Sequence, residues 1–217
     1  KLVFSANYTA QKNNQPATDL TAVSRTLAPN APVLYDADGN LNWENSTWDN
    51  PLATMLSEFD SNIKDLTANT VLSYQILKNL QAKSSFGYSD LKNTESRTQP
   101  HTMYNPAYGL GSEFSGLSVS QTDRSTWIVE PQLNWNTTFG KGKVEALVGS
   151  TFQQQKTNRL FMNGFGFSSN SLIHDLASAS MRKVRPAASG SSASKPTFSP
   201  RIFSSDEKIA AQGILSC

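Results

Sequence analysis

The segment TANTVLSYQILKNLQAKSSFGYS, residues 67–89, contains the pattern that decides the fold. On both sides of its centre apolar and polar side chains alternate, with Leu72, Tyr74, Phe86 and Tyr88 all at even positions. A period of two is typical of β-strands, whose successive side chains point to opposite faces. The break in the pattern near residues 77–79 predicts a tight turn, so the segment is expected to form a β-hairpin.

A second hairpin is predicted further along the chain. The segment TWIVEPQLNWNT, residues 126–137, places apolar side chains on one face and polar ones on the other. The glycines of FGKGK, residues 139–143, favour a turn, and the alternation returns in VEALVGSTFQ, residues 144–153. Pro131 weakens the first of these strands, because proline has no backbone N–H to donate to the ladder.

The opening segment KLVFSANYT, residues 1–9, alternates in the same way and is expected to be a fifth strand. Along the chain the connections after successive strands are long, short, long, short and long. The first, of about 55 residues, is far longer than is usual in a compact domain. Antiparallel strands joined in this order place every long connection at one end of the sheet, which is the layout of outer-membrane β-barrels.

Trp127 and Trp135 lie on one face of the same expected strand, eight residues apart. Eight extended residues span about 26 Å, or about 20 Å of height for a strand tilted by about 40°. This is close to the spacing of the two aromatic girdles of a membrane barrel, so both tryptophans are predicted to lie at membrane interfaces. The alternative for both is the core of a soluble sheet.

The fold class predicted from these patterns is all-β, with about five antiparallel strands of a large transmembrane β-barrel. Strands of about 10 residues suit a bilayer crossing. Five strands cannot close, since single-chain barrels begin at about eight strands and an open edge in lipid leaves backbone groups unpaired. We therefore expect the chain to be a fragment, and we expect neither a stable fold nor transport from the fragment alone.

Composition and motifs exclude several function classes. The formal net charge is +2 and no basic stripe appears before residue 180, so no nucleic-acid partner is expected. His101 and His174 have no cysteine or carboxylate partners at metal-binding spacing, so neither a metal nor another cofactor is expected. Acidic residues occur singly, and the sequence has no nucleophile elbow, phosphate-binding loop or zinc-protease motif. The chain is not expected to be an enzyme.

The long connection before the first hairpin contains NLNWENSTWDNP, residues 40–51, with two of the four tryptophans. Trp43 and Trp48 follow neither a helical nor a strand period. Packing of the loop on itself is the simpler interpretation, and contact with a solute or a lid protein is the functional one. The neighbouring DADGN, residues 36–40, predicts a turn rather than a calcium loop, whose glycine and glutamate are missing at the required positions.

Three segments, taken in order, resemble the SusC/RagA family of TonB-dependent outer-membrane transporters of Bacteroidetes-type bacteria. They are APNAPVLYDADGNLNWENSTWDNPL, LSYQILKNLQAKSSFGYS and WIVEPQLNWNTTFGKGKVEALVGSTFQ. The resemblance covers about residues 1–180 and lies early in the family's barrel, after the plug. None of the three segments is a catalytic signature.

The resemblance implies a barrel of about 22 strands with a plugged lumen. It implies energy-coupled import of oligosaccharides or peptides through the outer membrane, with outer-membrane lipid around the barrel and a SusD-like surface lipoprotein over its mouth. TonB would be contacted through an N-terminal plug region, for which these 217 residues have no counterpart. No TonB-contacting residue is therefore assigned.

The last part of the chain departs from the family. We divide the chain into residues 1–180, a partial TonB-dependent receptor β-barrel, and residues 181–217, a tail rich in serine, alanine and proline without alternation. The tail is predicted to be either an out-of-frame translation or a disordered segment.

The alternative for the whole chain is a soluble β-sandwich, a glycan-binding or adhesin module. The two architectures differ in the apolar face of the strands, which is exposed in a barrel wall and covered by a second sheet in a sandwich.

Overall fold

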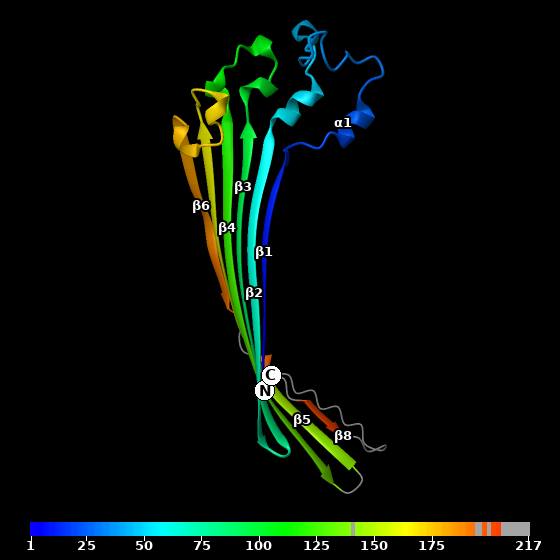
Figure 1. The fold of residues 1–217 in the computed structure, drawn as a ribbon, viewed down its shortest axis with the longest axis vertical. Coiled ribbons are helices and arrows are strands. Elements are labelled where there is room, and N and C mark those ends of the chain that lie inside the picture. The colour runs from blue at the N-terminus through cyan, green and yellow to red at the C-terminus, as the bar shows by residue number, and fades with distance from the viewer. Residues whose placement is uncertain (140–141, 194–196, 199–200, 205–217) are drawn as a thin grey trace.

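The computed structural model describes residues 1–139, 142–193, 197–198 and 201–204. These residues form one antiparallel sheet in which the neighbours follow chain order from β1 to β6 (Figure 1). Two short strands, β7 and β8, also pair with β5. The strands are β1 (Leu2–Pro16), β2 (Glu58–Leu77), β3 (Leu80–Gln99), β4 (Gly116–Phe139), β5 (Gly142–Phe165), β6 (Met181–Ala193), β7 (Thr197–Phe198) and β8 (Arg201–Ser204).

Both predicted hairpins are present, and the predicted all-β, antiparallel fold class is confirmed. β2 and β3 pair from Phe59 opposite Arg97 down to Leu77 opposite Leu80, and the turn between them is Lys78-Asn79. β4 and β5 pair in one register throughout. The glycine turn predicted between β4 and β5 falls on residues 140–141, which lie outside the described residues.

The expected strand length of about 10 residues was wrong. β1 has 15 residues, β2 and β3 have 20 each, and β4 and β5 have 24 each. The extra residues lie at the end that carries the long connections, where most side chains on both faces are polar. A strand segment with two polar faces shows no alternation of apolar and polar residues, so the sequence pattern could not predict the full length of the strands.

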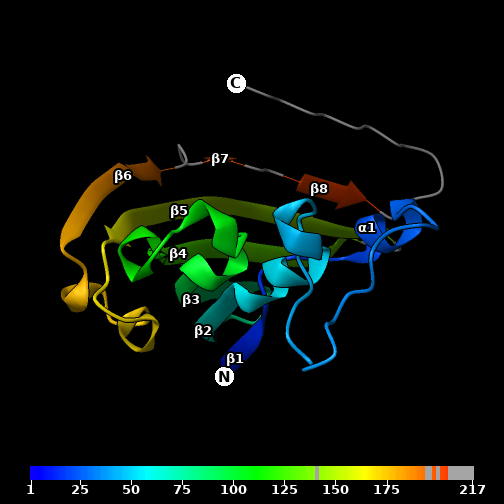
Figure 2. The same ribbon diagram turned by 90° about the horizontal axis from the view of Figure 1, so that it is seen from above.

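All three long connections lie at the same end of the sheet, as predicted (Figure 1). They are residues 17–57, 100–115 and 166–180. In the view from above they lie over this end of the strands (Figure 2). They contain one α-helix and seven short 3₁₀ helices among the described residues: α1 (Thr21–Thr26), η1 (Glu44–Ser46), η2 (Pro51–Leu56), η3 (His101–Met103), η4 (Pro106–Tyr108), η5 (Ser112–Phe114), η6 (Asn170–Leu172) and η7 (Leu176–Ser178).

A small cluster of buried apolar side chains lies at this end too. It consists of Leu117, Phe167, Ile173 and Ala179, with Val119 and Leu176 packed against it. The connection 166–180 thus folds down onto the ends of β4 and β5. No helix in the described part of the chain is long and apolar enough to cross a membrane.

The segment 181–217 contains a strand that the sequence pattern did not reveal. β6 pairs with β5 from Met181 opposite Phe165 to Ala193 opposite Gln154, with a register shift between Thr157 and Arg159. The expectation that this segment is a disordered or out-of-frame tail stays a prediction, and residues 205–217 lie outside the described residues.

Candidate functional site

One face of the sheet carries an exposed band of apolar side chains. Directly opposite residues of an antiparallel pair share a face, so the register assigns the even residues of β2 and the residues paired with them to this apolar face. Among its large side chains, Tyr74 is 69% and Phe4 is 66% exposed. We call the following set the apolar band: Leu2, Phe4, Tyr8, Leu66, Leu72, Tyr74, Ile76, Phe86, Tyr88, Trp127, Leu133, Trp135, Val148 and Phe152.

Aromatic residues mark both ends of this band. Trp127 lies directly opposite Tyr88, and its indole N–H donates to Gln154 Oε1 at 3.0 Å. Trp135 lies near the turn end of the sheet, opposite Leu80 on β3 and Ala146 on β5. The two tryptophans therefore occupy the same face at different heights, which is the arrangement that the prediction requires. Their contact with a membrane interface stays a prediction.

The opposite face of the same strands is mainly polar. Ser85 Oγ donates to Glu130 Oε2 at 2.9 Å across β3 and β4. Gln132 lies opposite both Lys83 and Gly149, and Asn134 lies opposite Gln81. We call this side the polar face. The sheet thus separates an apolar surface from a polar one without a second layer of described residues on either side.

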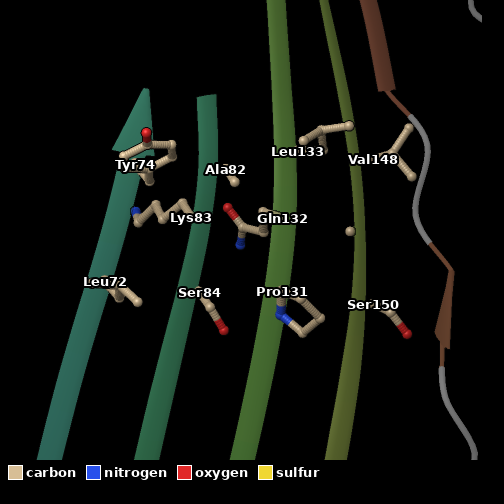
Figure 3. Close-up of a pocket in the computed structure, with 11 residues that line it drawn as sticks. Leu72, Tyr74, Ala82, Lys83, Ser84, Pro131, Gln132, Leu133, Val148 and Ser150 are labelled. Carbon is tan, nitrogen blue, oxygen red and sulfur yellow. The ribbon is translucent and has the colours of Figure 1, made fainter. Parts of the chain in front are cut away.

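A shallow groove of about 430 Å³ crosses the apolar band on four neighbouring strands (Figure 3). Its centre holds the small side chains of Ala82, Ser84 and Pro131, flanked by larger ones such as Leu72 and Leu133. The pairing of β4 with β5 is interrupted at residues 130–131 and resumes in the same register. This fits the missing N–H of proline.

The connection 17–57 is folded on itself. Asn50, only 3% exposed, donates from Nδ2 to the carbonyls of Leu34 at 2.6 Å and Asn42 at 3.0 Å, and its Oδ1 accepts from Leu52 N–H at 3.0 Å. Three bonds from one buried side chain join both sides of the loop that carries Trp43.

The turn predicted in DADGN is confirmed. Gly39 has a φ of +83°, and the carboxylate of Asp36 accepts from the backbone N–H groups of Asp38 and Asn40 at 3.0 and 2.8 Å. The positive φ requires glycine at this position or strains any other residue. The acidic side chain is therefore used to close a turn.

Trp43 and Trp48 are both half-buried, and they flank a strained turn. The backbone N–H of Trp48 donates to the Trp43 carbonyl at 3.4 Å. Between them Glu44, Asn45 and Ser46 all have positive φ values of 44°, 54° and 72°. A left-handed residue other than glycine costs about 1–2 kcal/mol, so the surrounding contacts must hold this turn. The predicted contact of the two tryptophans with a solute or a lid stays a prediction.

The first two connections meet at this strained turn. Asn105, 3% exposed, donates from Nδ2 to the Ser46 carbonyl at 3.3 Å, and its Oδ1 accepts from Ala107 N–H at 3.0 Å. Below it, the fully buried Ser57 donates to the Thr98 carbonyl, and Thr98 Oγ1 accepts from Glu58 N–H at 3.0 Å. These bonds fix connection 17–57 to the ends of β2 and β3.

A buried polar network joins the second and third connections. Ser115, fully buried, donates from Oγ to Asn170 Oδ1 at 2.7 Å and accepts from His101 N–H at 2.9 Å. His101 Nδ1 lies 3.0 Å from Asn170 Oδ1. Sequence reasoning missed this network, because 69 residues separate His101 from Asn170 and no local pattern relates them.

One group of described residues has the composition of a metal site. Glu58, Asp60 and His174 offer ligand atoms within 4.8 Å of one another, although no carboxylate partner for His174 was expected from its spacing in the chain. His174 Nε2 lies 3.7 Å from Glu58 Oε2, and Asp60 Oδ1 accepts from Asn14 at 2.7 Å. The side chains of His174 and Glu58 are about half exposed, and their pairing explains the proximity without an ion.

Hydrogen bonds lower the pKa of two carboxyls in the connections. The Thr21 hydroxyl and then the Thr21 backbone N–H, both donating to Asp19, hold the pKa of Asp19 below its ordinary value. The Ser178 hydroxyl and the Ala177 N–H act in the same way on the pKa of Asp175. Both carboxylates are stabilised in the charged form and close short helical turns.

Comparison with known proteins shows a similarity to a TonB-dependent receptor. No protein-family model matches the chain. TonB-dependent receptor P3 of Formosa agariphila is 25% identical to it over 168 residues, which are 76% of this chain and 16% of that protein. The resemblance to TonB-dependent receptors is confirmed. The chain spans about one-sixth of the length of this curated relative.

Solved structures of the RagAB peptide importer have the same fold. A structure of the RagAB peptide transporter matches with a TM-score of 0.71, and the closed-closed and open-open states match with 0.68 each. The identity is 15% in each case, and the match covers 95% of this chain and 24% of the other. The described sheet therefore has the architecture of part of a RagA-type barrel wall.

Proposed function

We propose that the chain forms part of the barrel wall of a TonB-dependent transporter that imports peptides or glycans through the outer membrane of a Bacteroidetes-type bacterium. The observation that carries this proposal is the single-layer sheet with an exposed apolar band on one face, a polar opposite face and every long connection at one end. The relatives named above, a TonB-dependent receptor and a peptide importer, support it.

In this proposal the apolar band faces lipid and the polar face lines the lumen. Lipid-facing and lumen-facing side chains alternate in an outer-membrane barrel, with aromatic girdles at both interfaces. Tyr88 with Trp127 would lie at the outer interface, and Trp135 at the inner one. The long ends of β2 to β5 would then project above the membrane and carry the connections outside the cell.

The soluble alternative finds no support in the described residues. A glycan-binding sandwich would cover the apolar band with a second sheet, because large apolar patches are rare on soluble monomers. The described strands β1 to β6 pair in chain order, and β7 and β8 pair with β5. None of these described strands forms a second sheet over the apolar band. The groove across the band is apolar and open, as expected for a surface that meets lipid chains.

Solute and lid contacts belong to the outward connections. A SusD-like lipoprotein would cover this end, and TonB would act through a plug region on the inner side. Trp43 and Trp48 are partly exposed and lie in connection 17–57, the longest of the three. They are therefore the candidates for contact with the lid or the solute. Aromatic rings supply large contact areas with little loss of side-chain entropy.

The test is uptake by cells that lack the gene for the whole protein. Fluorescent peptides and fluorescent oligosaccharides are supplied separately, and each is measured with and without an uncoupler of the proton gradient. We expect one class of solute to lose its uncoupler-sensitive uptake after deletion, and complementation to restore it. Unchanged uptake of both classes would contradict the proposal, and the class that is lost identifies the cargo.

A further inference from the structure

Four cationic side chains follow one another across the polar face, in the part of the sheet nearer the long connections. Arg124 on β4 and Arg159 on β5 are diagonal neighbours in the register, and so are Arg159 and Arg185 on β6. Lys183 lies on the same face of β6, two residues before Arg185. All four side chains are exposed, and diagonal neighbours on a sheet are within reach of long side chains. We call these four residues the basic line.

The basic line has no acidic neighbour on its own face among the described residues. Its direct neighbours there include Leu91, Thr122, Thr157, Phe161 and Asn163. The acids of this face that come nearest are Asp65 on β2 and Glu95 on β3, each two strands away from an arginine of the line. Two strand spacings are about 10 Å, and Glu95 is also two residues from Arg97, which offsets its charge.

The positive charge of the line is therefore not neutralised within the described sheet. The ion pairs recorded among the described residues are Lys143 with Glu145 and His174 with Glu58, and neither involves the line. Neighbouring like charges on a sheet are destabilising. An anion that lies across the line would remove this repulsion.

A hollow of about 440 Å³ lies on the polar face beside the basic line. The small side chains of Ser118 and Ser120 on β4 stand at its centre, between Arg97 on β3 and Phe161 on β5. Phe161 lies directly opposite Arg185, so one wall of the hollow adjoins the line. Sites for small ligands have volumes of about 300–1,000 Å³ and combine apolar contact with a few polar groups. The hollow offers this combination next to the line.

We propose that the basic line binds carboxylate groups of the solute that the transporter imports. The inference rests on the proposed function, in which the polar face lines the lumen and the long connections lie outside the cell. The planar fork of an arginine matches a carboxylate with two parallel hydrogen bonds. Charges of one sign along a narrow passage also attract solutes of the opposite sign and accelerate their association. The line lies toward the outer mouth, where the solute enters, and Phe161 would contact the uncharged part of the solute.

The experiment measures solute binding to the whole outer-membrane protein that contains this chain, purified in detergent, by isothermal titration calorimetry. The peptide probe has glutamates at alternate positions, about 7 Å apart in an extended chain, which is close to the about 7–8 Å between diagonal neighbours of a sheet. Its neutral partner has glutamine at the same positions. Oligogalacturonate and its methyl ester form the corresponding pair of glycan probes.

The test variant combines Arg124→Gln, Arg159→Gln and Arg185→Gln. The matched control combines Lys12→Gln, Lys64→Gln and Lys92→Gln, which removes the same charge from exposed positions of the apolar face. Each of these lysines has an aspartate as a direct or diagonal neighbour on its own face: Asp60 for Lys12, Asp90 for Lys64 and Asp123 for Lys92.

We expect the test variant to bind at least one of the two acidic probes about tenfold more weakly than the wild type, while the control variant binds like the wild type. The neutral probes should bind all three proteins alike. The acidic probe that responds identifies the source of the carboxylates as a peptide or a glycan. The proposal is overturned by equal binding of the acidic probes to the test variant and the wild type, or by an equal loss in the control variant. It is also overturned if neither acidic probe binds the wild type more tightly than its neutral partner.

Thermal unfolding and uptake separate this proposal from the proposed function. The test variant should unfold at the wild-type temperature or higher, because neighbouring like charges are removed. If it does not fold, Arg159→Gln alone decides in the same assay, since Arg159 is the diagonal neighbour of both other arginines. Uncoupler-sensitive uptake that persists in cells with the test variant, together with unchanged binding of the acidic probes, would reject the carboxylate site alone.

Discussion

His101 Nδ1 lies 3.0 Å from Asn170 Oδ1, although 69 residues separate the two in the chain. Ser115 is bonded to both residues and is fully buried. Two of the three long connections are thus joined by a small polar network above the strands, rather than lying independently over the sheet. The rigidity of this end of the sheet depends on a few buried hydrogen bonds.

The first prediction concerns this network. Ser115→Ala removes the acceptor of the His101 N–H and the donor to Asn170, which should cost about 1–3 kcal/mol of local stability because a buried N–H is left without a partner. Hydrogen exchange in residues 100–115 and 166–180 of the whole protein should accelerate. Ser112→Ala is the control, since the Ser112 side chain makes no hydrogen bond among the described residues. Equal exchange in the two variants would contradict the role of the network.

The second prediction concerns the loop that carries Trp43. Asn50→Asp keeps the oxygen that accepts from the Leu52 N–H. It replaces the NH₂ group that donates to the carbonyls of Leu34 and Asn42 with a carboxylate oxygen, which cannot donate. We expect connection 17–57 to loosen by about 2 kcal/mol or more, because a buried carboxylate would face two carbonyl oxygens. Protease cleavage within this connection measures the effect.

The matched control for that loop is Asn30→Ala, an exposed asparagine of the same connection. It should be cleaved at the wild-type rate. If Asn50→Asp is also cleaved at the wild-type rate, Asn50 does not hold the loop together.

The third prediction tests the contact between connection 166–180 and the strands. A Cβ on Gly164 would lie 2.8 Å from Leu176 Cδ1 and 2.9 Å from Ala179 Cβ, which is closer than carbon atoms pack. Gly164→Ala should therefore displace this connection and cost about 1–3 kcal/mol. A Cβ on Gly190 would have no atom within 4 Å, so Gly190→Ala is the control. Equal protease sensitivity of residues 166–180 in both variants would show that the contact is not tight.

The sequence could predict the lower half of the sheet and not the upper half. Alternation around Leu72, Phe86 and Leu133 reflects an apolar face beside a polar one, so both hairpins could be recognised. Nearer the long connections, Asn62 and Lys64 alternate with Ser61 and Asp65 on the same strand, so both faces are mainly polar there. The backbone pairing between the strands continues there, but the polarity of the side chains no longer indicates a strand.

The candidate site divides in the same way. Trp127 and Trp135 could be placed on one face from their spacing, and the structure puts them there. The convergence of His101 with Asn170, and of His174 with Glu58, depends on how three connections fold over the strand ends.

In the proposed barrel wall the apolar band contacts lipid and the polar face contacts water. Single cysteines at Phe86 and Ser85, adjacent residues of β3 on opposite faces, test it in the whole protein reconstituted in liposomes without other cysteines. Each carries a spin label, whose collision rates with oxygen and with a water-soluble nickel chelate are measured. We expect mainly oxygen collisions at position 86 and mainly nickel collisions at position 85. A label at position 86 that meets the nickel chelate as often as the label at position 85 would contradict it.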